Sequence, residues 1–297
     1  PRVAIAWRPW AKRSLRVRAG YGVYFNGSVY NSAVTRLAQQ PPFANSATIN
    51  SSLANPLSMQ NGFVSVVPTD VTNTYAIFRQ YAVGYAQTWN VNVQHDLPAS
   101  FVMEAGYLGT KGTRLDIQRV PNSAPPGSPL TSEDRRRIGN ATGFILDTSD
   151  GNSVYHSGQL RVTRRFRKGI SMNALYTYSK SIDDVSTYGG GQGVVVQDPT
   201  NLSAERGLSS FDVRHTFNSS FILTSPVGDG ASLVPLKGWA KKLLEEWTLN
   251  GGLVARSGSP FTAVVLGNRS DAGGTGVVGS ARADATGLQV DAGSGFF

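Results

Sequence analysis

The chain has 297 residues, of which 33 are glycine, none is cysteine and only 16% are charged, against about 25% in an average soluble domain. This profile argues against a cytosolic helical enzyme, and it excludes disulfide scaffolds, thiolate zinc sites and cysteine nucleophiles. The net charge of +9 prompts a nucleic-acid hypothesis, but the arginines alternate with apolar residues and no zinc-finger or RNP-like motif occurs, so no nucleic-acid partner is predicted.

Alternation of apolar and polar residues with a period of two predicts about eight strands along the chain. The expected strands cover residues 3–7, 15–25, 85–97, 101–109, 159–166, 170–179, 213–223 and 247–258. In the segment 85–97 the apolar face carries Trp89, Val91, Val93 and Leu97. No apolar stretch has the roughly 18 residues of a membrane helix, whereas tilted strands of about 9 to 11 alternating residues cross a bilayer without one.

The connections between these strands alternate between short and long. Short turns follow residues 7, 97 and 166, whereas about 60, 45 and 30 residues follow the second, fourth and sixth strands. Three-residue turns predict that Leu97 pairs with Phe101 and that Phe166 pairs with Ile170. The connection 224–246 belongs to the short-turn end and is expected to be an elaborated turn that closes with a short amphipathic helix. Short periplasmic turns and long extracellular loops are typical of outer-membrane barrels.

Alternation alone fits both a membrane barrel and a soluble β-sandwich lectin. Strand lengths near ten residues, the asymmetry of the connections and the aromatic residues of the apolar face favour the barrel. These aromatic residues are Trp7, Trp89, Tyr107, Tyr176, Tyr178 and Trp247. The predicted fold is therefore all-β, an antiparallel transmembrane β-barrel segment in the outer membrane of a Gram-negative bacterium, with lipid as a partner. A barrel leaves the apolar face on the convex side of one curved sheet, whereas a sandwich buries it between two sheets.

Candidate catalytic and metal-binding residues are few. The histidines His95, His156 and His215 all lie on apolar faces with no obvious serine and carboxylate beside them, and no G-x-S-x-G motif occurs, so no enzyme activity is predicted. An acidic extracellular loop holds the candidates Asp183, Asp184, Asp198 and Glu205, together with Asp212. Oxygen-rich loops can bind calcium. Because Arg206 and Arg214 lie in the same segment, ion pairs that order the loop are the expected role, and no metal or cofactor is predicted.

Several segments resemble a known family when they are read in this order and spacing. They are LRVRAGYGVYF (15–25), AGYLGTKGTRL (105–115), GQLRVTRRFRKGISMNALYTYSKSIDD (158–184), QDPTNLSAERGLSSFDVRHTF (197–217) and EEWTLNGGLVARSGSPFT (245–262). Together they resemble the barrel region of TonB-dependent outer-membrane receptors, and especially the Oar-like subgroup, whose members carry an N-terminal carboxypeptidase-regulatory-like domain. The resemblance covers nearly the whole chain. It implies a barrel of about 22 strands around an N-terminal plug, of which residues 1–297 are a part truncated at both ends, with plug and N-terminal domains absent.

The resemblance also implies a function. Receptors of this family take up a scarce ligand with energy relayed by the TonB complex, so the implied partners are the protein's own plug, the TonB complex and an unidentified ligand. The polar face would then line the lumen, and its candidates are Arg16, Arg18, Glu104, Arg161 and Arg165. Packing of these residues against the plug is favoured over direct ligand contact. The alternative function is a surface-exposed outer-membrane binding or adhesion protein without transport.

Overall fold

The computed structural model describes residues 1–27, 29–40, 42–44, 56, 58–60, 74–124, 132–139, 144–167, 169–185, 196, 198–199, 201–225, 238–244 and 247–262. The strands are β1 (Arg2–Trp7), β2 (Arg16–Phe25), β3 (Tyr75–Ile77), β4 (Tyr85–Leu97), β5 (Phe101–Arg119), β6 (Ile145–Arg167), β7 (Ile170–Asp183), β8 (Gly207–Leu208), β9 (His215–Thr224) and β10 (Thr248–Arg256). The helices are α1 (Val29–Ala38), α2 (Ser132–Arg135) and α3 (Trp239–Leu244), with 3-10 turns at Pro98–Ser100 and Leu202–Glu205. None of the helices in these ranges is long and apolar enough to cross a membrane.

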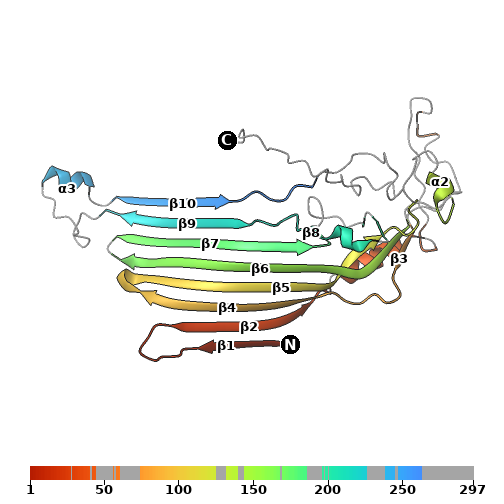
Figure 1. Cartoon of the computed structure of the whole chain (residues 1–297). Helices are drawn as coiled ribbons and strands as arrows, with labels where there is room; N and C mark the ends of the chain where they lie inside the picture. Colours follow the sequence, from red (N-terminus) through yellow and green to blue (C-terminus); the bar gives the residue numbers. More distant parts are fainter. Residues whose placement is uncertain are drawn as a thin grey trace, which may run out of the picture.

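All ten strands belong to one sheet, in which the long strands lie side by side in chain order (Figure 1). The order is β1-β2-β4-β5-β6-β7-β9-β10, and every neighbouring pair along it is antiparallel. These eight strands correspond to the eight predicted from the alternation, so the prediction of an antiparallel all-β fold is confirmed. Within the described residues β1 and β10 each pair on one side only, and the sheet is not closed, as expected for part of a barrel.

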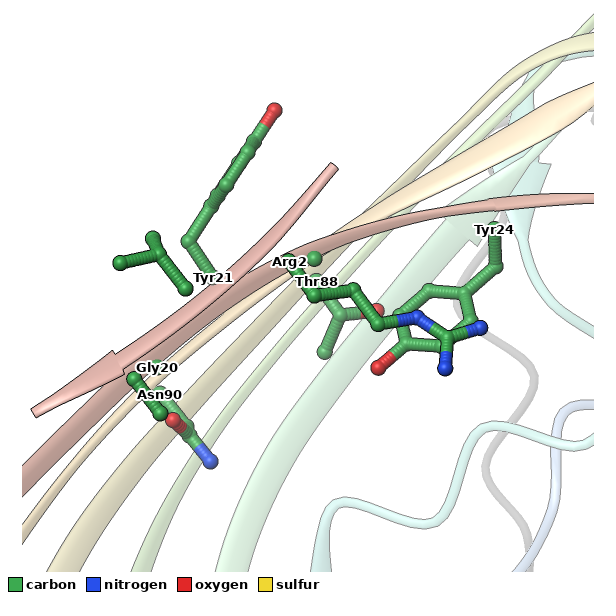
Figure 2. Close-up of a pocket in the computed structure, with 9 residues that line it drawn as sticks. Arg2, Gly20, Tyr21, Tyr24, Thr88 and Asn90 are labelled. Atoms are coloured by element: carbon green, nitrogen blue, oxygen red, sulfur yellow. The ribbon is translucent and has the colours of Figure 1, made fainter.

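The register joins apolar residues to apolar residues across the sheet. On one face the directly paired residues include Tyr21 with Trp89, Val91 with Tyr107, Leu160 with Tyr176, and Tyr176 with Phe217. Successive side chains of a strand point to opposite faces, so the residues between them form polar rows on the other face. Figure 2 shows this division in β1, β2 and β4, where Tyr21 projects from one side of the sheet and Arg2, Thr88 and Asn90 from the other.

The apolar face of the sheet is not covered by another layer of described residues. Tyr107, Leu160 and Leu249 are 41%, 42% and 60% exposed. The buried hydrophobic residues of the described chain lie instead at the long-loop end, and they are Tyr75, Ile117, Val120, Ala124 and Val196. A sandwich would bury the apolar face, so the soluble-lectin alternative is wrong.

The two predicted short turns differ in outcome. Leu97 pairs with Phe101, as predicted. Phe166 does not pair with Ile170, because the register shifts between Arg164 and Arg167 and Arg167 becomes the partner of Ile170. Gly169 in this turn has a φ of 76°, a left-handed conformation that suits a two-residue hairpin turn. The bulge that accompanies the tighter turn removes Arg165 and Phe166 from the regular ladder.

The long connections contain more regular structure than the sequence pattern indicates. β5 continues to Arg119 and β6 begins at Ile145, so about half of the predicted loop is a two-stranded ribbon. The pattern misses this ribbon because residues on both of its faces are buried, as the neighbours Ile117 and Gln118 show. The short strand β3 pairs with β6 in parallel, and β8 pairs with the end of β7. The predicted short helix before the last strand is present as α3.

Candidate functional site

Four of the five predicted lumen-facing residues lie on one face of the sheet. Register aligns Arg16 with Gln94, Gln94 with Glu104, and Glu104 with Arg161, in one row across four strands. Glu104 and Arg161 have opposite charges and are direct cross-strand partners, an arrangement that stabilises a sheet. Arg18 lies in the next row on the same face, opposite Asn92.

The fifth residue, Arg165, lies within the register shift between Arg164 and Arg167, near the turn. The structure therefore brings Arg16, Arg18, Glu104 and Arg161 together in an arginine-rich polar face, whereas the position of Arg165 on this face stays a prediction.

A hollow of about 330 Å³ opens on the polar face over β1 and β2 (Figure 2). It is lined by Arg2, Val3, Ala4, Gly20, Tyr21, Gly22, Tyr24, Thr88 and Asn90, and we call it the Arg2 hollow. The guanidinium carbon of Arg2 lies 4.5 Å from the centre of the Tyr24 ring. The sequence pattern did not single out this site, because Arg2 precedes the predicted first strand and Tyr24 reads as an ordinary polar-face residue.

Small residues form the floor of the Arg2 hollow. A Cβ atom on Gly22 would lie only 2.9 Å from the Tyr24 ring, and one on Gly20 would lie 2.8 Å from Oδ1 of Asn90. Both larger side chains therefore rest directly on a glycine backbone. A larger residue at either position would force the side chain above it to shift.

Aromatic and histidine side chains form a belt on the apolar face towards the long loops. This aromatic belt consists of Trp89, Tyr107, His156, Tyr176, Tyr178 and His215. Oη of Tyr107 lies 2.7 Å from Nδ1 of His156, and Oη of Tyr176 lies 2.8 Å from Nδ1 of His215. Amphipathic rings with their polar atoms paired suit the boundary between hydrocarbon and headgroups.

His95, at the short-turn end, has a serine beside it that the sequence did not reveal. Oγ of Ser14 lies 3.0 Å from Nδ1 of His95 and accepts a hydrogen bond from the backbone N–H of Asp96. His95 and Asp96 are neighbours in one strand, so their side chains point to opposite faces. The serine hydroxyl therefore fixes the first short turn against β4, and no Ser-His-carboxylate arrangement is formed by these three residues.

The acidic loop after β7 is held by hydrogen bonds to its carboxylates. Ser209 is completely buried, and its hydroxyl donates to Asp183 and lies 2.7 Å from Oγ of Ser181. The backbone N–H of Ser181 donates to Oδ1 of Asp212 at 2.6 Å, and Oδ2 of Asp212 lies 3.5 Å from Arg214. These bonds attach the returning chain to the end of β7.

The other acidic candidates are Asp184, Asp198 and Glu205. Oδ1 of Asp184 accepts a hydrogen bond from the backbone N–H of Asn152, and burial raises the pKa of Asp184 above its ordinary value. Glu205 is buried in a 3-10 turn, and the carbonyl of Asp198 accepts from the N–H of Asn201 at 3.1 Å. Among the residues that the structure describes, no group of three or more His, Cys, Asp or Glu could hold a metal ion.

Replacing Ser209 with alanine is expected to weaken the attachment of this loop to β7. The change removes a donor to the buried Asp183 carboxylate, a loss that costs about 1–3 kcal/mol. Hydrogen exchange of the Ser209 and Ser181 amides should accelerate accordingly. Ser203→Ala removes an exposed hydroxyl of the same segment and serves as the control. Equal exchange rates in the two variants would contradict this role of Ser209.

A second network attaches the chain after β2 to the ribbon of β5 and β6. The side-chain amide of Gln40, just beyond α1, donates to the carbonyl of Tyr75 and accepts from its N–H, at 2.8 and 2.6 Å. The Tyr75 hydroxyl donates to the buried carboxylate of Asp147, and the Arg36 guanidinium lies 5.4 Å from the Tyr75 ring. Tyr81 donates to Asp116 at 3.0 Å. This network lies beyond the aromatic belt, outside the membrane.

The attachment of β3 to the ribbon is expected to weaken as the pH rises. Burial raises the pKa of Asp147 and of Asp116, so the folded ribbon keeps their protons at pH values where the unfolded chain has lost them. The attachment of β3 is then most stable at a pH below 3.8, the ordinary pKa of aspartate. Its stability falls as the pH rises through the raised pKa values of the two carboxyl groups.

Asp116→Asn removes one of the two titrating carboxyl groups, so the stability of the β3 attachment should depend less on pH in this variant. Exchange of the Phe78 amide, which donates to the carbonyl of Asp147, reports the attachment directly. The ratio of variant to wild-type exchange at each pH cancels the intrinsic pH dependence of exchange. A wild-type attachment that strengthens between pH 4 and 7 would contradict the expected sign.

These features define a class of protein: a wall of long antiparallel strands with one uncovered apolar face, an aromatic belt and ordered loops at one end. The chain belongs to the outer membrane beta barrel domain family, whose model matches residues 1–295. It is accordingly a protein of the Gram-negative outer membrane.

Comparison with solved structures finds similarity to outer-membrane transporters. The outer membrane transporter YddB from Escherichia coli shares 9% identity and a TM-score of 0.48, over 85% of this chain and 32% of that chain. The FrpB iron transporter from Neisseria meningitidis (F3-3 variant) shares 11% identity and a TM-score of 0.40, over 75% of this chain and 24% of that chain. The chain thus spans about a third or less of each transporter. No curated protein sequence matches it.

Proposed function

We propose that this chain is part of the barrel wall of a TonB-dependent outer-membrane transporter of the Oar-like subgroup. The observation that carries the proposal is the two-faced sheet, which presents an uncovered apolar surface on one side and arginine-rich polar rows on the other. A wall of this kind separates lipid from a polar lumen. The sequence segments that resemble TonB-dependent receptors support the finer assignment.

In this proposal the rest of the barrel and an N-terminal plug belong to the same protein. Arg16, Arg18, Glu104 and Arg161 face the lumen, where they contact the plug or a passing ligand. The TonB complex supplies the energy for uptake through the plug, and the outer-membrane lipid covers the aromatic belt and the apolar face. The chain itself supplies the wall and the loops and has no catalytic role.

The experiment that tests this function measures binding of the full-length protein to the purified periplasmic domain of TonB. The full-length protein, extracted in detergent, should bind that domain, and removal of the segment before the barrel should abolish binding. A barrel that folds and reaches the outer membrane but shows no TonB binding would contradict the proposal.

One observation favours the alternative, a surface-exposed binding or adhesion protein without transport. β5 and β6 have 19 and 23 residues, whereas about 9 to 11 residues cross the membrane. The extra length forms a ribbon beyond the aromatic belt. The network around Asp147 holds further chain against this ribbon, and the network around Ser209 holds chain against the end of β7. An ordered surface of this kind suits a protein-binding platform, which predicts retained surface binding in cells that lack TonB.

A further inference from the structure

We propose that the Arg2 hollow binds an oxyanion, the phosphate or carboxylate group of a ligand, and that Arg2 is the residue that recognises it. This inference names the ligand chemistry of the proposed transporter wall. Only one part of the inference depends on the proposed function, namely that the bound ligand then passes through the lumen.

The contact of Arg2 with the Tyr24 ring prepares the guanidinium group for binding. With its carbon atom 4.5 Å from the ring centre, the group is held by a cation-π contact. No hydrogen bond or ion pair to another described residue occupies the N–H groups of Arg2. Those N–H groups form a rigid fork that matches the two oxygens of a carboxylate or phosphate.

The floor of the hollow explains why Tyr24 can hold Arg2 in this position. The ring lies on Gly22, where a Cβ atom would be 2.9 Å from the ring, so any larger residue would displace the ring and the guanidinium with it. Asn90 lies over Gly20 in the same manner and places its amide on the same side of the sheet as Arg2 (Figure 2). The amide group and the Thr88 hydroxyl supply further polar atoms to the hollow.

The charge of this part of the wall favours an anion over a cation or a neutral sugar. Arg18 and Arg16 lie on the same face, four and six residues from Gly22 along β2, or about 13 and 20 Å. The ion pairs between described residues join Arg119 to Asp150 and Arg214 to Asp212, and none involves these three arginines. Between the hollow and the short turns, Arg2, Arg16, Arg18 and Arg161 outnumber the carboxylates of Glu104 and Asp96 on this face, so its potential is positive.

The hollow lies at the long-loop end of the strands. Arg2 pairs with Gly22, and the neighbouring Tyr21 pairs on the opposite face with Trp89 of the aromatic belt. Arg2 is thus the first of the three arginines that an anion entering from the loop side would meet. Arg18 and Arg16 continue the series towards the short turns.

The test is binding of inorganic pyrophosphate to the full-length protein in detergent, measured by isothermal titration calorimetry at fixed ionic strength. Arg2→Gln should lower the affinity at least tenfold. Tyr24→Leu, which keeps every charge, should lower it at least threefold because the guanidinium group loses its support. Arg8→Gln removes an equal charge from the exposed turn after β1 and should change the affinity less than twofold. Circular dichroism establishes that each variant is folded.

Three results would overturn the inference: no binding of pyrophosphate by the wild-type protein, unchanged binding by Arg2→Gln, or equal losses in Arg2→Gln and Arg8→Gln. Binding of maltose in place of pyrophosphate would instead identify a neutral-sugar site and would also overturn it. The measurement uses neither TonB nor an energy source. Arg2-dependent binding in a protein that fails to bind TonB would therefore refute the transport function and leave the oxyanion site intact.

Discussion

Replacing Leu160 with arginine is expected to lower the free energy of unfolding of the protein in a lipid bilayer by about 2–4 kcal/mol. Leu160 lies on the apolar face, where it pairs with Ala105 and Tyr176 and is 42% exposed. In the proposed barrel wall this exposed area contacts lipid, so a guanidinium group at this position would enter hydrocarbon without a polar partner.

The position of Leu160 along β6 gives the substitution its large effect. His156 of the aromatic belt and Arg164, which lies 5.4 Å from the Phe101 ring, mark the two ends of the apolar band on this strand. They are separated by eight residues, or about 26 Å along the strand. A tilt of about 40° reduces this span to about 20 Å across the membrane, with Leu160 at its middle.

Gln159→Arg is the matched control for this prediction, because Gln159 is the neighbour of Leu160 and its side chain lies on the polar face opposite Thr177. It should change the free energy of unfolding by less than about 0.5 kcal/mol. Urea unfolding in bilayers, followed by tryptophan fluorescence, measures both variants. Equal costs for the two arginines would show that the apolar face does not contact lipid.

Replacing Gly109 with valine should also destabilise the barrel, by about 1–3 kcal/mol. Gly109 pairs with Trp89, whose indole lies over it so closely that a Cβ atom would be 2.4 Å from Nε1. The larger side chain must displace the indole, whose ring centre is 6.2 Å from that of His156, and so disturb the aromatic belt. The near-ultraviolet circular dichroism of the tryptophans should change together with the unfolding midpoint.

Gly158→Val provides the control for this substitution. Gly158 lies on the same face of the adjacent strand, opposite Tyr107, and a Cβ atom there would have no atom within 4 Å. Valine also has a higher β-propensity than glycine, so the variant should be as stable as the wild type or slightly more stable. If Gly158→Val were as destabilising as Gly109→Val, the close indole contact would not explain the cost.

The strands and their two faces could be predicted from the sequence because the alternation within one segment is enough to assign its apolar and its polar face. Trp89, Val91 and Val93 alternate with polar residues whatever their neighbours are, and the structure pairs each of them with an apolar-face residue on β2. Chain order then supplied the neighbours, because sequential strands joined by short turns pair with each other.

The remaining features depend on contacts that no local pattern records. The bulge at Arg164 to Arg167 follows from a turn one residue shorter than the pattern suggested, and the ribbon beyond the belt is stabilised by burial on both faces. The parallel pairing of β3 with β6 joins segments about 70 residues apart. The Arg2 hollow escaped prediction for the same reason, because its parts meet only when β1, β2 and β4 are in register.

The most direct test of the membrane wall is a scan of site accessibility along β6 of the full-length protein in bilayers. The chain contains no cysteine, so single cysteines can be introduced into it from residue 157 to residue 163 and labelled with nitroxides without background from this region. We expect labels at 158, 160 and 162 to be relaxed strongly by oxygen, which dissolves in lipid, and labels at 157, 159, 161 and 163 to be relaxed more by a water-soluble nickel chelate. Protection of 158, 160 and 162 from both reagents would show that protein covers the apolar face and would contradict the barrel wall.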